Sequence, residues 1–323
     1  CPDWPPLMQI EKLQVQDRPP QEGEADFQIL SSRADGSPTC QVTPDTAVCR
    51  QCLAEMTNPT DFRYRYPFIA CTHCGPRYTL IKSVPYDRPN TTMDRFLMCD
   101  RCHRQYTNPT DRRFHAQPVA CPVCGPQIWF EAGGKKLAEK EDALQTARRW
   151  LAEGKILAVK GLGGFHLVCD AANAAAVQTL RERKHRTGKP FALMAFDLPT
   201  IEKYIILSHE ARRLISSPQA PIILAEMTEA GKVLAQIVAP DQTRLGFMLP
   251  YTPLHLLLLE PAPNFSEVLV MTSGNLSEEH IAYENAEARE RLESLADGFL
   301  MHDRPIYMRI DDSVVTILRE KPY

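Results

Sequence analysis

The sequence predicts an α/β or α+β fold built on a mixed sheet, preceded by a small metal-binding module. Three observations lead to this prediction. From about residue 142 onward, apolar runs of strand length alternate with amphipathic helical segments. Before that point, four Cys-x-x-Cys pairs form two copies of one motif, offset by 50 residues. The chain has 323 residues, which is enough for two or three domains.

The first 48 residues form a leader in which we expect little regular structure. They hold 3 lysines and arginines against 8 aspartates and glutamates. The chain opens neither with Met nor with a signal peptide, so we expect a central piece of a longer, cytoplasmic protein. No apolar run approaches the roughly 18 residues that a membrane-spanning helix needs, so we expect no membrane partner.

The duplicated motif lies within residues 49–130 and predicts two structural zinc ions. The copies read CRQCLAEMTNPTDFRYRYPFIACTHCGP and CDRCHRQYTNPTDRRFHAQPVACPVCGP, and in each the two cysteine pairs are separated by 18 residues. Two such pairs complete a tetrahedral sulfur site that suits zinc, and four cysteines leave no open position for catalysis. Pairing within each copy is the simpler arrangement, and an interleaved pairing stays open. The expected ligands are Cys49, Cys52, Cys71, Cys74, Cys99, Cys102, Cys121 and Cys124.

The second domain is predicted to span residues 140–323. We expect residues 125–140, at the boundary between the domains, to form a turn and then the start of a helix. The elements of the second domain follow from apolar spacing and run length. Amphipathic helices are expected at 143–155, 173–184 and 284–295, and short strands at 156–161, 191–196, 220–226, 268–275 and 313–318.

Two stretches of this domain suit a phosphate-bearing ligand. The run KHRTGKP supplies three cations, Lys184, Arg186 and Lys189, although cations at a helix end also satisfy the helix dipole. The run MTSGN ends a strand with Ser273 and Asn275. Their polar groups and the exposed backbone N–H groups suit phosphates at the mouth of a sheet, and an ordinary turn is the alternative.

A third stretch, VKGLGGFHLVCDA, contains Lys160, His166 and three glycines. Glycines at this density favour a close approach of the backbone to a ligand. The stretch is not a dinucleotide fingerprint, because His166 occupies the last glycine position, and the chain has no GxxxxGK(S/T) phosphate loop. If the protein binds ATP, it does so by another route.

Together and in this order, these motifs resemble those of the hydrogenase maturation family HypF, over essentially the whole chain. The tandem cysteine copies with TNPTD and CGP look like the HypF zinc-finger region. The runs KGLGGFHLVCDA, RKHRTGKPFALM, RLGFMLPYTPLH, MTSGNLS and RIDDSVV look like its YrdC-like domain. The resemblance therefore implies a tandem zinc-knuckle domain followed by a YrdC-like nucleotide-binding domain with a twisted mixed sheet.

The resemblance also implies a reaction. HypF proteins use carbamoyl phosphate and ATP, with Mg²⁺, to make carbamoyl adenylate, and they pass the carbamoyl group to the C-terminal cysteine of HypE. That group becomes the cyanide ligands of nickel–iron hydrogenases. The acylphosphatase-like domain and the C-terminal transfer domain that flank this region in the family show no trace in this sequence.

Residue roles follow from the same resemblance. Cations aimed at the phosphates stabilise the charge that adenylation develops there. The implied residues are Lys184, Arg186 and Lys189 for this charge, Ser273 and Asn275 for the nucleotide, Lys160 and His166 for the carbamate end, and Asp311 and Asp312 for Mg²⁺.

Two other functions stay open. The YrdC fold also serves threonylcarbamoyl-adenylate synthases of tRNA modification, although that fold does not need paired zinc modules. A zinc-dependent module that binds RNA or protein is the other alternative, since residues 49–124 hold 11 lysines and arginines against 6 acids. The net charge of the whole chain is −3 and few aromatics stand in stacking arrays, so we expect no nucleic-acid partner.

Overall fold

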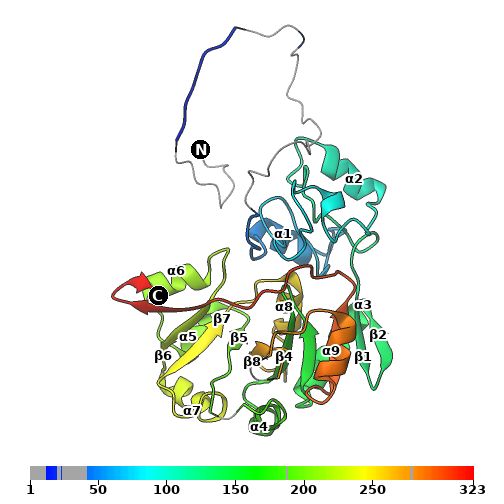
Figure 1. Ribbon diagram of the computed structural model, residues 1–323. Helices are drawn as coiled ribbons and strands as arrows, with labels where there is room; N and C mark the ends of the chain where they lie inside the picture. Colours follow the sequence, from blue (N-terminus) through cyan, green and yellow to red (C-terminus); the bar gives the residue numbers. More distant parts are fainter. Residues whose placement is uncertain (1–11, 20–22, 24–41, 187, 277–278) are drawn as a thin grey trace.

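The protein consists of a finger module placed on one side of a sheet domain (Figure 1). The structure, a computed structural model, describes residues 12–19, 23, 42–186, 188–276 and 279–323. Most of the leader expected at residues 1–48 lies outside the described residues. Its last part joins the finger module, where Thr46 forms an antiparallel bridge with Gly75.

Each copy of the cysteine motif begins with a short helix at its first cysteine pair. These helices are α1 (Arg50–Thr57) and α2 (Asp100–Thr107), and a single turn of 3₁₀ helix, η1 (Arg88–Asn90), lies between them. In both copies the Asn of TNPTD, Asn58 or Asn108, accepts a hydrogen bond at 3.1 Å from the backbone N–H two residues later. The same local bonds in both copies show that the sequence repeat is a structural repeat.

The sheet domain contains one mixed sheet of eleven strands, which confirms the predicted fold class. Neighbouring strands follow the order β11-β10-β6-β7-β5-β8-β4-β3-β9-β1-β2. Three pairs are parallel, β3 with β9, β5 with β7 and β6 with β10, and the others are antiparallel. The strands are β1 (Ile128–Ala132), β2 (Lys135–Glu139), β3 (Leu157–Lys160), β4 (Phe165–Asp170), β5 (Leu193–Ala195), β6 (Ile222–Glu226), β7 (Arg244–Met248), β8 (Val268–Ser273), β9 (Gly298–His302), β10 (Val314–Leu318) and β11 (Lys321–Pro322).

Side chains on the two faces of the sheet enter two different hydrophobic cores. In β8, Val268 and Val270 join one core, while Leu269 and Met271 join the other, as the two-residue period of a strand requires. The first core is closed by α4 (Ala174–Arg183), α5 (Leu198–Tyr204), α6 (His209–Ile215), α7 (Glu229–Val238) and α9 (Asn285–Leu292). The second is closed by α3 (Lys140–Ala152), α8 (Pro253–Leu259) and the finger module.

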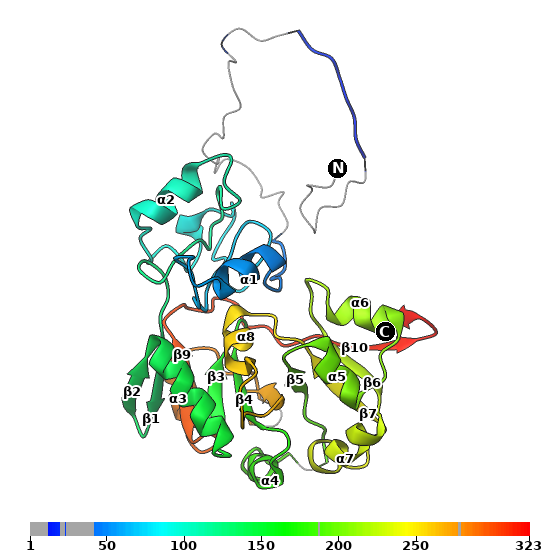
Figure 2. The same ribbon diagram turned by 180° about the vertical axis from the view of Figure 1, so that it is seen from behind.

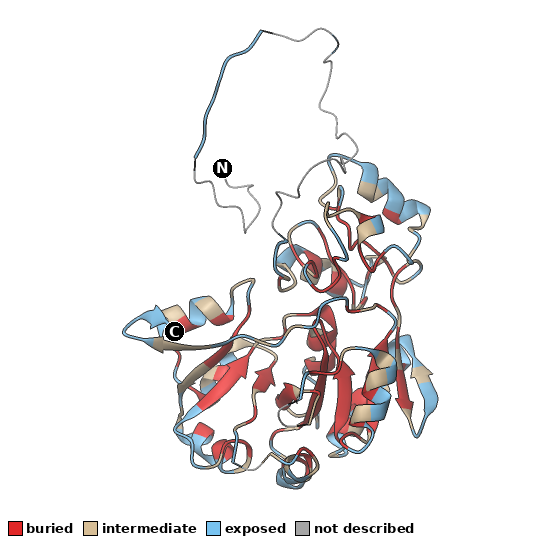
Figure 3. Cartoon of the chain, in the orientation of Figure 1, coloured by how far each residue is buried: buried red, intermediate tan, exposed pale blue. Residues whose placement is uncertain are grey.

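The figures show these layers from both sides. Helix α9 lies in front of the sheet in Figure 1, and α3 and α8 lie in front of it in Figure 2. The central strands are buried, whereas the edge strands β2 and β11 are exposed (Figure 3). No helix in the described part of the chain is long and apolar enough to cross a bilayer.

The segment 125–140 differs from the expectation. It forms a β-hairpin, β1 and β2, with its turn at Gly133 and Gly134, and the helix begins only at Lys140. Strand β1 pairs with β9, so the sheet starts before the expected domain start at residue 140. Strand β2 reads KKLAE and is almost wholly exposed. Its sequence therefore lacks the alternation of apolar and polar residues that indicates a strand, and its conformation depends on pairing with β1.

Candidate functional site

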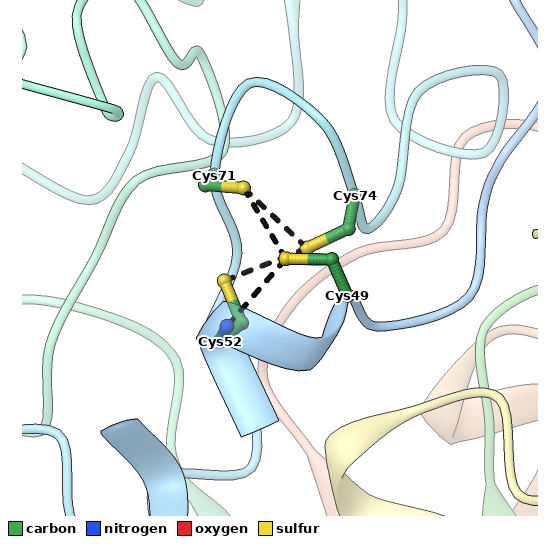
Figure 4. Close-up of side chains that lie close together, drawn as sticks. All are labelled: Cys49, Cys52, Cys71 and Cys74. Carbon is green, nitrogen blue, oxygen red and sulfur yellow. Dashed lines mark hydrogen bonds between the residues drawn. The ribbon is translucent and has the colours of Figure 1, made fainter. Parts of the chain in front are cut away.

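The eight predicted cysteine ligands form two four-sulfur clusters, one in each copy of the motif. Within each cluster the four Sγ atoms lie within 4.8 Å of one another. In the first cluster the Sγ atoms are 3.8 Å apart for Cys49 and Cys71, 3.7 Å for Cys71 and Cys74, and 3.5 Å for Cys52 and Cys74 (Figure 4). Sulfurs bound at about 2.3 Å to one tetrahedral zinc would be about 3.8 Å apart, so the donor set fits zinc. The ligands pair within each copy and do not interleave.

Two buried arginines at equivalent positions connect the copies crosswise. Arg63, from the first copy, donates from Nε to the carbonyl of Ala120 at 2.7 Å, directly before a ligand of the second cluster. Arg113, from the second copy, donates from Nε to the carbonyl of Ala70 at 3.1 Å, directly before a ligand of the first cluster. Each metal site is therefore supported by a side chain from the other copy.

The first cluster also has a cation against one of its sulfurs. Arg112 donates to Cys52 Sγ from Nη1 at 3.2 Å and from Nη2 at 3.3 Å, and it pairs with Glu55 at 2.7 Å. The equivalent position of the first copy is Phe62, which has no donor, and there Arg63 Nη2 donates to Cys102 Sγ of the second cluster at 3.4 Å. Arg112 thus offsets part of the negative charge that four thiolates would place on the first site.

In the sheet domain, the predicted Lys184, Ser273 and Asn275 meet in one place. The Lys184 ammonium donates at 2.6 Å to the carbonyls of Ser273 and Asn275 and to Asn275 Oδ1. Ser273 Oγ donates to the same Asn275 Oδ1 at 2.8 Å. Burial lowers the pKa of Lys184 to about 7. The lysine at the end of α4 therefore holds the end of β8 in a defined shape.

A cavity of about 350 Å³, hereafter the first cavity, opens beside this corner. Arg186 and Ser273 are among its lining residues. Arg186 donates from Nη2 to the carbonyl of Pro190 at 2.8 Å, while its buried Nε finds no hydrogen-bond acceptor among the described residues. A guanidinium and a serine at the mouth of the sheet form a pair that can bind a phosphate.

Lys189 and Lys160 lie elsewhere. Lys189 is exposed and does not line the first cavity, although it follows Arg186 closely in sequence. Lys160 is buried in a narrow cleft between the finger module and the sheet, where its ammonium donates to Asn285 Oδ1 at 2.6 Å. Burial, with nearby Arg304, lowers the pKa of Lys160 to about 7.

His166 lines the first cavity, and it makes a contact there that the sequence did not predict. Its Nε2 lies 3.0 Å from Asp312 Oδ2, and both residues line the cavity. Burial raises the pKa of Asp312, but the hydrogen bond and charge of His166, together with Tyr251 and His255, outweigh it, so the net pKa is lowered. Asp312 was a predicted Mg²⁺ ligand, and no sequence motif indicates that it pairs with His166 across 146 residues.

A second cavity, of about 200 Å³, adjoins the first. The two share His166, Asp311 and Asp312 as lining residues. Its far wall is formed by Asp45, Thr46 and their neighbours, from the segment that leads into the first finger. The sequence predicted a leader with little regular structure here, and no residue pattern in it marks a site.

Comparison with protein families matches both parts of this architecture. The family model of the Sua5, YciO and YrdC proteins, described as "Telomere recombination", matches residues 149–323. A model described as "HypF finger" matches residues 48–81 and 98–131. The chain is a HypF-type member of the Sua5/YciO/YrdC family. The recognition from motifs alone is therefore confirmed, and each HypF finger match contains one of the four-sulfur clusters.

Curated HypF proteins resemble the chain over nearly all of its length. The chain is 51% identical to the carbamoyltransferase HypF of Synechocystis sp., covering 98% of this chain and 41% of that protein. It is 50% identical to the carbamoyltransferase HypF of Rhodobacter capsulatus, covering 97% of this chain and 41% of that protein. This HypF-type chain thus spans about two fifths of the length of these relatives.

Solved structures of HypF proteins resemble this chain in fold as well as in sequence. The crystal structure of full-length HypF in the phosphate- and nucleotide-bound form is 50% identical, with a TM-score of 0.80, covering 85% of this chain and 36% of that one. The crystal structure of T. kodakarensis HypF is 41% identical, with a TM-score of 0.84, covering 88% and 37%. P. abyssi Sua5 complexed with L-threonine, 15% identical at a TM-score of 0.50 over 58% and 54%, shares the fold alone.

Proposed function

We propose that this chain forms carbamoyl adenylate from carbamate and ATP, as the adenylating part of a HypF-type carbamoyltransferase for hydrogenase maturation. The observation that carries the proposal is the first cavity, where Arg186 and Ser273 line a space next to the corner held by Lys184. The relatives named carbamoyltransferase HypF support the reaction class. A HypF structure in a phosphate- and nucleotide-bound form supports the ligand class.

In the proposed step, a carbamate oxygen attacks the α-phosphorus of ATP. The new phosphorus–oxygen bond forms as the bond to the bridging oxygen of pyrophosphate breaks, and pyrophosphate leaves with its electron pair. Negative charge grows on the phosphoryl oxygens and on the leaving group, so fixed cations stabilise the transition state. Arg186 contacts the phosphates through its guanidinium, which can grip two oxygens at once. Lys184 supplies a buried positive charge and holds Ser273 and Asn275 in place for the nucleotide.

The other predicted residues take lesser parts in this proposal. Lys189, on the exposed loop, adds to the field that attracts the triphosphate. His166 stands at the carbamate end, where the two cavities meet, while Lys160 supports that end from the cleft next to the fingers. Asp311 lines the first cavity, and Asp312 is already bound to His166, so Asp311 is the better placed of the two to meet the Mg²⁺ of ATP.

The fingers and the rest of the protein complete the proposal. Zinc in the two clusters would contribute folding free energy to a module that covers one face of the sheet. Because the chain spans about two fifths of its relatives, carbamoyl phosphate cleavage and transfer to HypE are assigned to an acylphosphatase-like domain and a C-terminal domain of the whole protein.

Carbamate-dependent ATP–pyrophosphate exchange, measured on the 323-residue chain with added ammonium carbamate, tests the proposal. Arg186→Gln should slow exchange about 100-fold, the usual effect of removing one donor that acts on developing charge. Arg212→Gln is the matched control, because Arg212 lies on α6, pairs with Glu202 and does not line either cavity. Absence of exchange in the wild type, or exchange that requires threonine with bicarbonate, would overturn the proposal.

A further inference from the structure

The second cavity differs in charge from the first. Its lining includes three carboxylates, those of Asp45, Asp311 and Asp312, and neither a lysine nor an arginine. The first cavity shares Asp311 and Asp312, lacks Asp45 and is also lined by Arg186. The two cavities meet at His166, so a ligand that spans them would place an anionic end beside Arg186 and its other end in an acidic chamber.

Asp45 lines this chamber with one carboxylate oxygen bound to backbone N–H groups and the other buried. Its Oδ1 accepts hydrogen bonds from the backbone N–H groups of Arg77 and Thr79, which orient the carboxylate. Its Oδ2 is buried and, within the described part of the chain, has no hydrogen-bond donor. Burial raises the pKa of Asp45. A buried acceptor without a donor is unfavourable in the free protein and awaits a ligand that donates.

Thr46 repeats this situation one residue later. Its backbone is fixed by paired hydrogen bonds of 3.1 Å to Gly75, next to the first metal cluster. The residue is 7% exposed, and its Oγ1 finds no partner among the residues described. Backbone bonds from Ala47 to Pro218 at 2.8 Å and from Val48 to Tyr251 at 3.0 Å hold the segment against the sheet domain. Two buried oxygens without hydrogen-bond partners among the described residues therefore belong to a rigid segment that lines the chamber.

We infer that the second cavity is the subsite for the amino end of carbamate, with Asp45 and Thr46 accepting its N–H donors. This inference rests on the proposed function. Carbamate has an anionic carboxylate, which matches Arg186 in the first cavity, and an NH₂ group, which matches acceptors without donors. A site built around N–H recognition rejects analogues that lack the donor, because its own polar groups are then left unpaired. Bicarbonate and acetate lack this group.

A divalent cation is the other ligand that an acidic chamber attracts, and the geometry disfavours it. Among the described residues, the only sets of three or more His, Cys, Asp or Glu ligand atoms that gather within 4.8 Å are the two cysteine clusters. Asp312 is also engaged by His166 at 3.0 Å. The acids of the chamber are thus spread along its wall, as suits a small organic group and not a compact metal site.

Asp45→Asn is the sharpest test, because the backbone N–H groups of Arg77 and Thr79 require an oxygen on their side. The new amide must then turn its NH₂ into the chamber, where it replaces an acceptor by a donor. In carbamate-dependent exchange, the KM for carbamate should rise about 10-fold to 100-fold, the equivalent of one hydrogen bond to a charged group. The KM for ATP should stay within about twofold.

Thr46→Val keeps the shape of the side chain and removes only the unpaired hydroxyl. It should raise the KM for carbamate several-fold and leave the Tm of the unliganded chain equal or higher, since no hydrogen bond is lost there. If Asp45→Asn fails to fold, as judged by the zinc content of that variant, the KM for carbamate of Thr46→Val alone tests the subsite. The matched control is Asp111→Asn, an acid of the same module that caps Arg113 N–H at 2.8 Å and lines neither cavity.

The outcomes separate the two claims. Wild-type chain without carbamate-dependent exchange would overturn both the proposed function and the subsite. Normal wild-type exchange with an unchanged carbamate KM in Asp45→Asn and Thr46→Val would overturn the subsite alone. A rise in the KM for ATP, or a shift in the Mg²⁺ dependence with carbamate affinity unchanged, would show that the chamber serves the nucleotide or a metal and would also overturn it.

Discussion

Replacing Arg113 by methionine should weaken the metal site of the other copy. Arg113 belongs to the second copy, yet its guanidinium donates to the carbonyl of Ala70 and pairs with Glu55, both in the first copy. Ala70 directly precedes Cys71, a ligand of the first cluster. Methionine fills a similar volume without donors, so the perturbation removes the hydrogen bonds and the charge while keeping most of the packing.

The structure sets the size of this effect. Leaving the buried Ala70 carbonyl without its donor costs about 1–3 kcal/mol. The lost ion pair adds up to about 1 kcal/mol, because Glu55 is partly exposed and keeps Arg112 as a partner. A total of roughly 1–4 kcal/mol corresponds to a local opening of the first site that is roughly 5-fold to 700-fold more frequent.

Alkylation of cysteines by iodoacetamide, mapped by peptide mass spectrometry, measures this opening for each site. In Arg113→Met, peptides that contain Cys71 should be modified before those that contain Cys121. Arg63→Met should give the reverse order, because Arg63 supports Ala120 beside the second cluster. Arg50→Met, an exposed position of α1, is the control and should change neither rate. If each variant exposed the cysteines of its own copy first, the crosswise support described above would be wrong.

Two further predictions concern the metal and the buried lysine. Cys52→Ser should lose about one of two zinc ions per chain, measured by elemental analysis, and should unfold the first finger; full retention of both ions would contradict the four-sulfur site. The pKa of Lys184 is lowered to about 7 in the folded protein, so the unfolded chain binds more protons between pH 7 and about 10.5, and the free energy of unfolding should rise by roughly 1 kcal/mol per pH unit across that window. In denaturant titrations at pH 7 and pH 9, Lys184→Met should show a smaller increase in the free energy of unfolding with pH than the wild type. The part of the increase that comes from Lys160 should remain. An unchanged dependence of the unfolding free energy on pH would show that Lys184 does not titrate in this range.

The sheet and the metal ligands follow from local sequence, whereas the edge of the sheet does not. Apolar runs such as 268–275 have few alternatives to a buried strand, and paired Cys-x-x-Cys motifs have few alternatives to a metal site. The hairpin at 128–139 was missed because β2 is a charged, exposed edge strand. Its conformation depends on β1, which depends in turn on β9 at the other end of the chain.

The candidate site was predictable only where neighbours in sequence are also neighbours in space. Ser273 and Asn275 lie on one strand end, and the lysine that binds them was in a predicted motif. Sequence spacing could not tell that Arg186 faces the first cavity while Lys189 faces solvent, because a loop has no fixed period. Asp45 acquires its place from bonds to residues of the first finger, so no local pattern announces it.

The core beneath the fingers has a consequence for how proteins of this family gain or lose domains. Phe68 and Ile69 from the first finger pack in the same hydrophobic cluster as Leu254 of α8 and Met248 of β7. The domain boundary that the sequence indicates is therefore not a break in the hydrophobic core of the folded protein. A YrdC-like protein could gain or lose these fingers in evolution only if that face of its sheet were repacked at the same time.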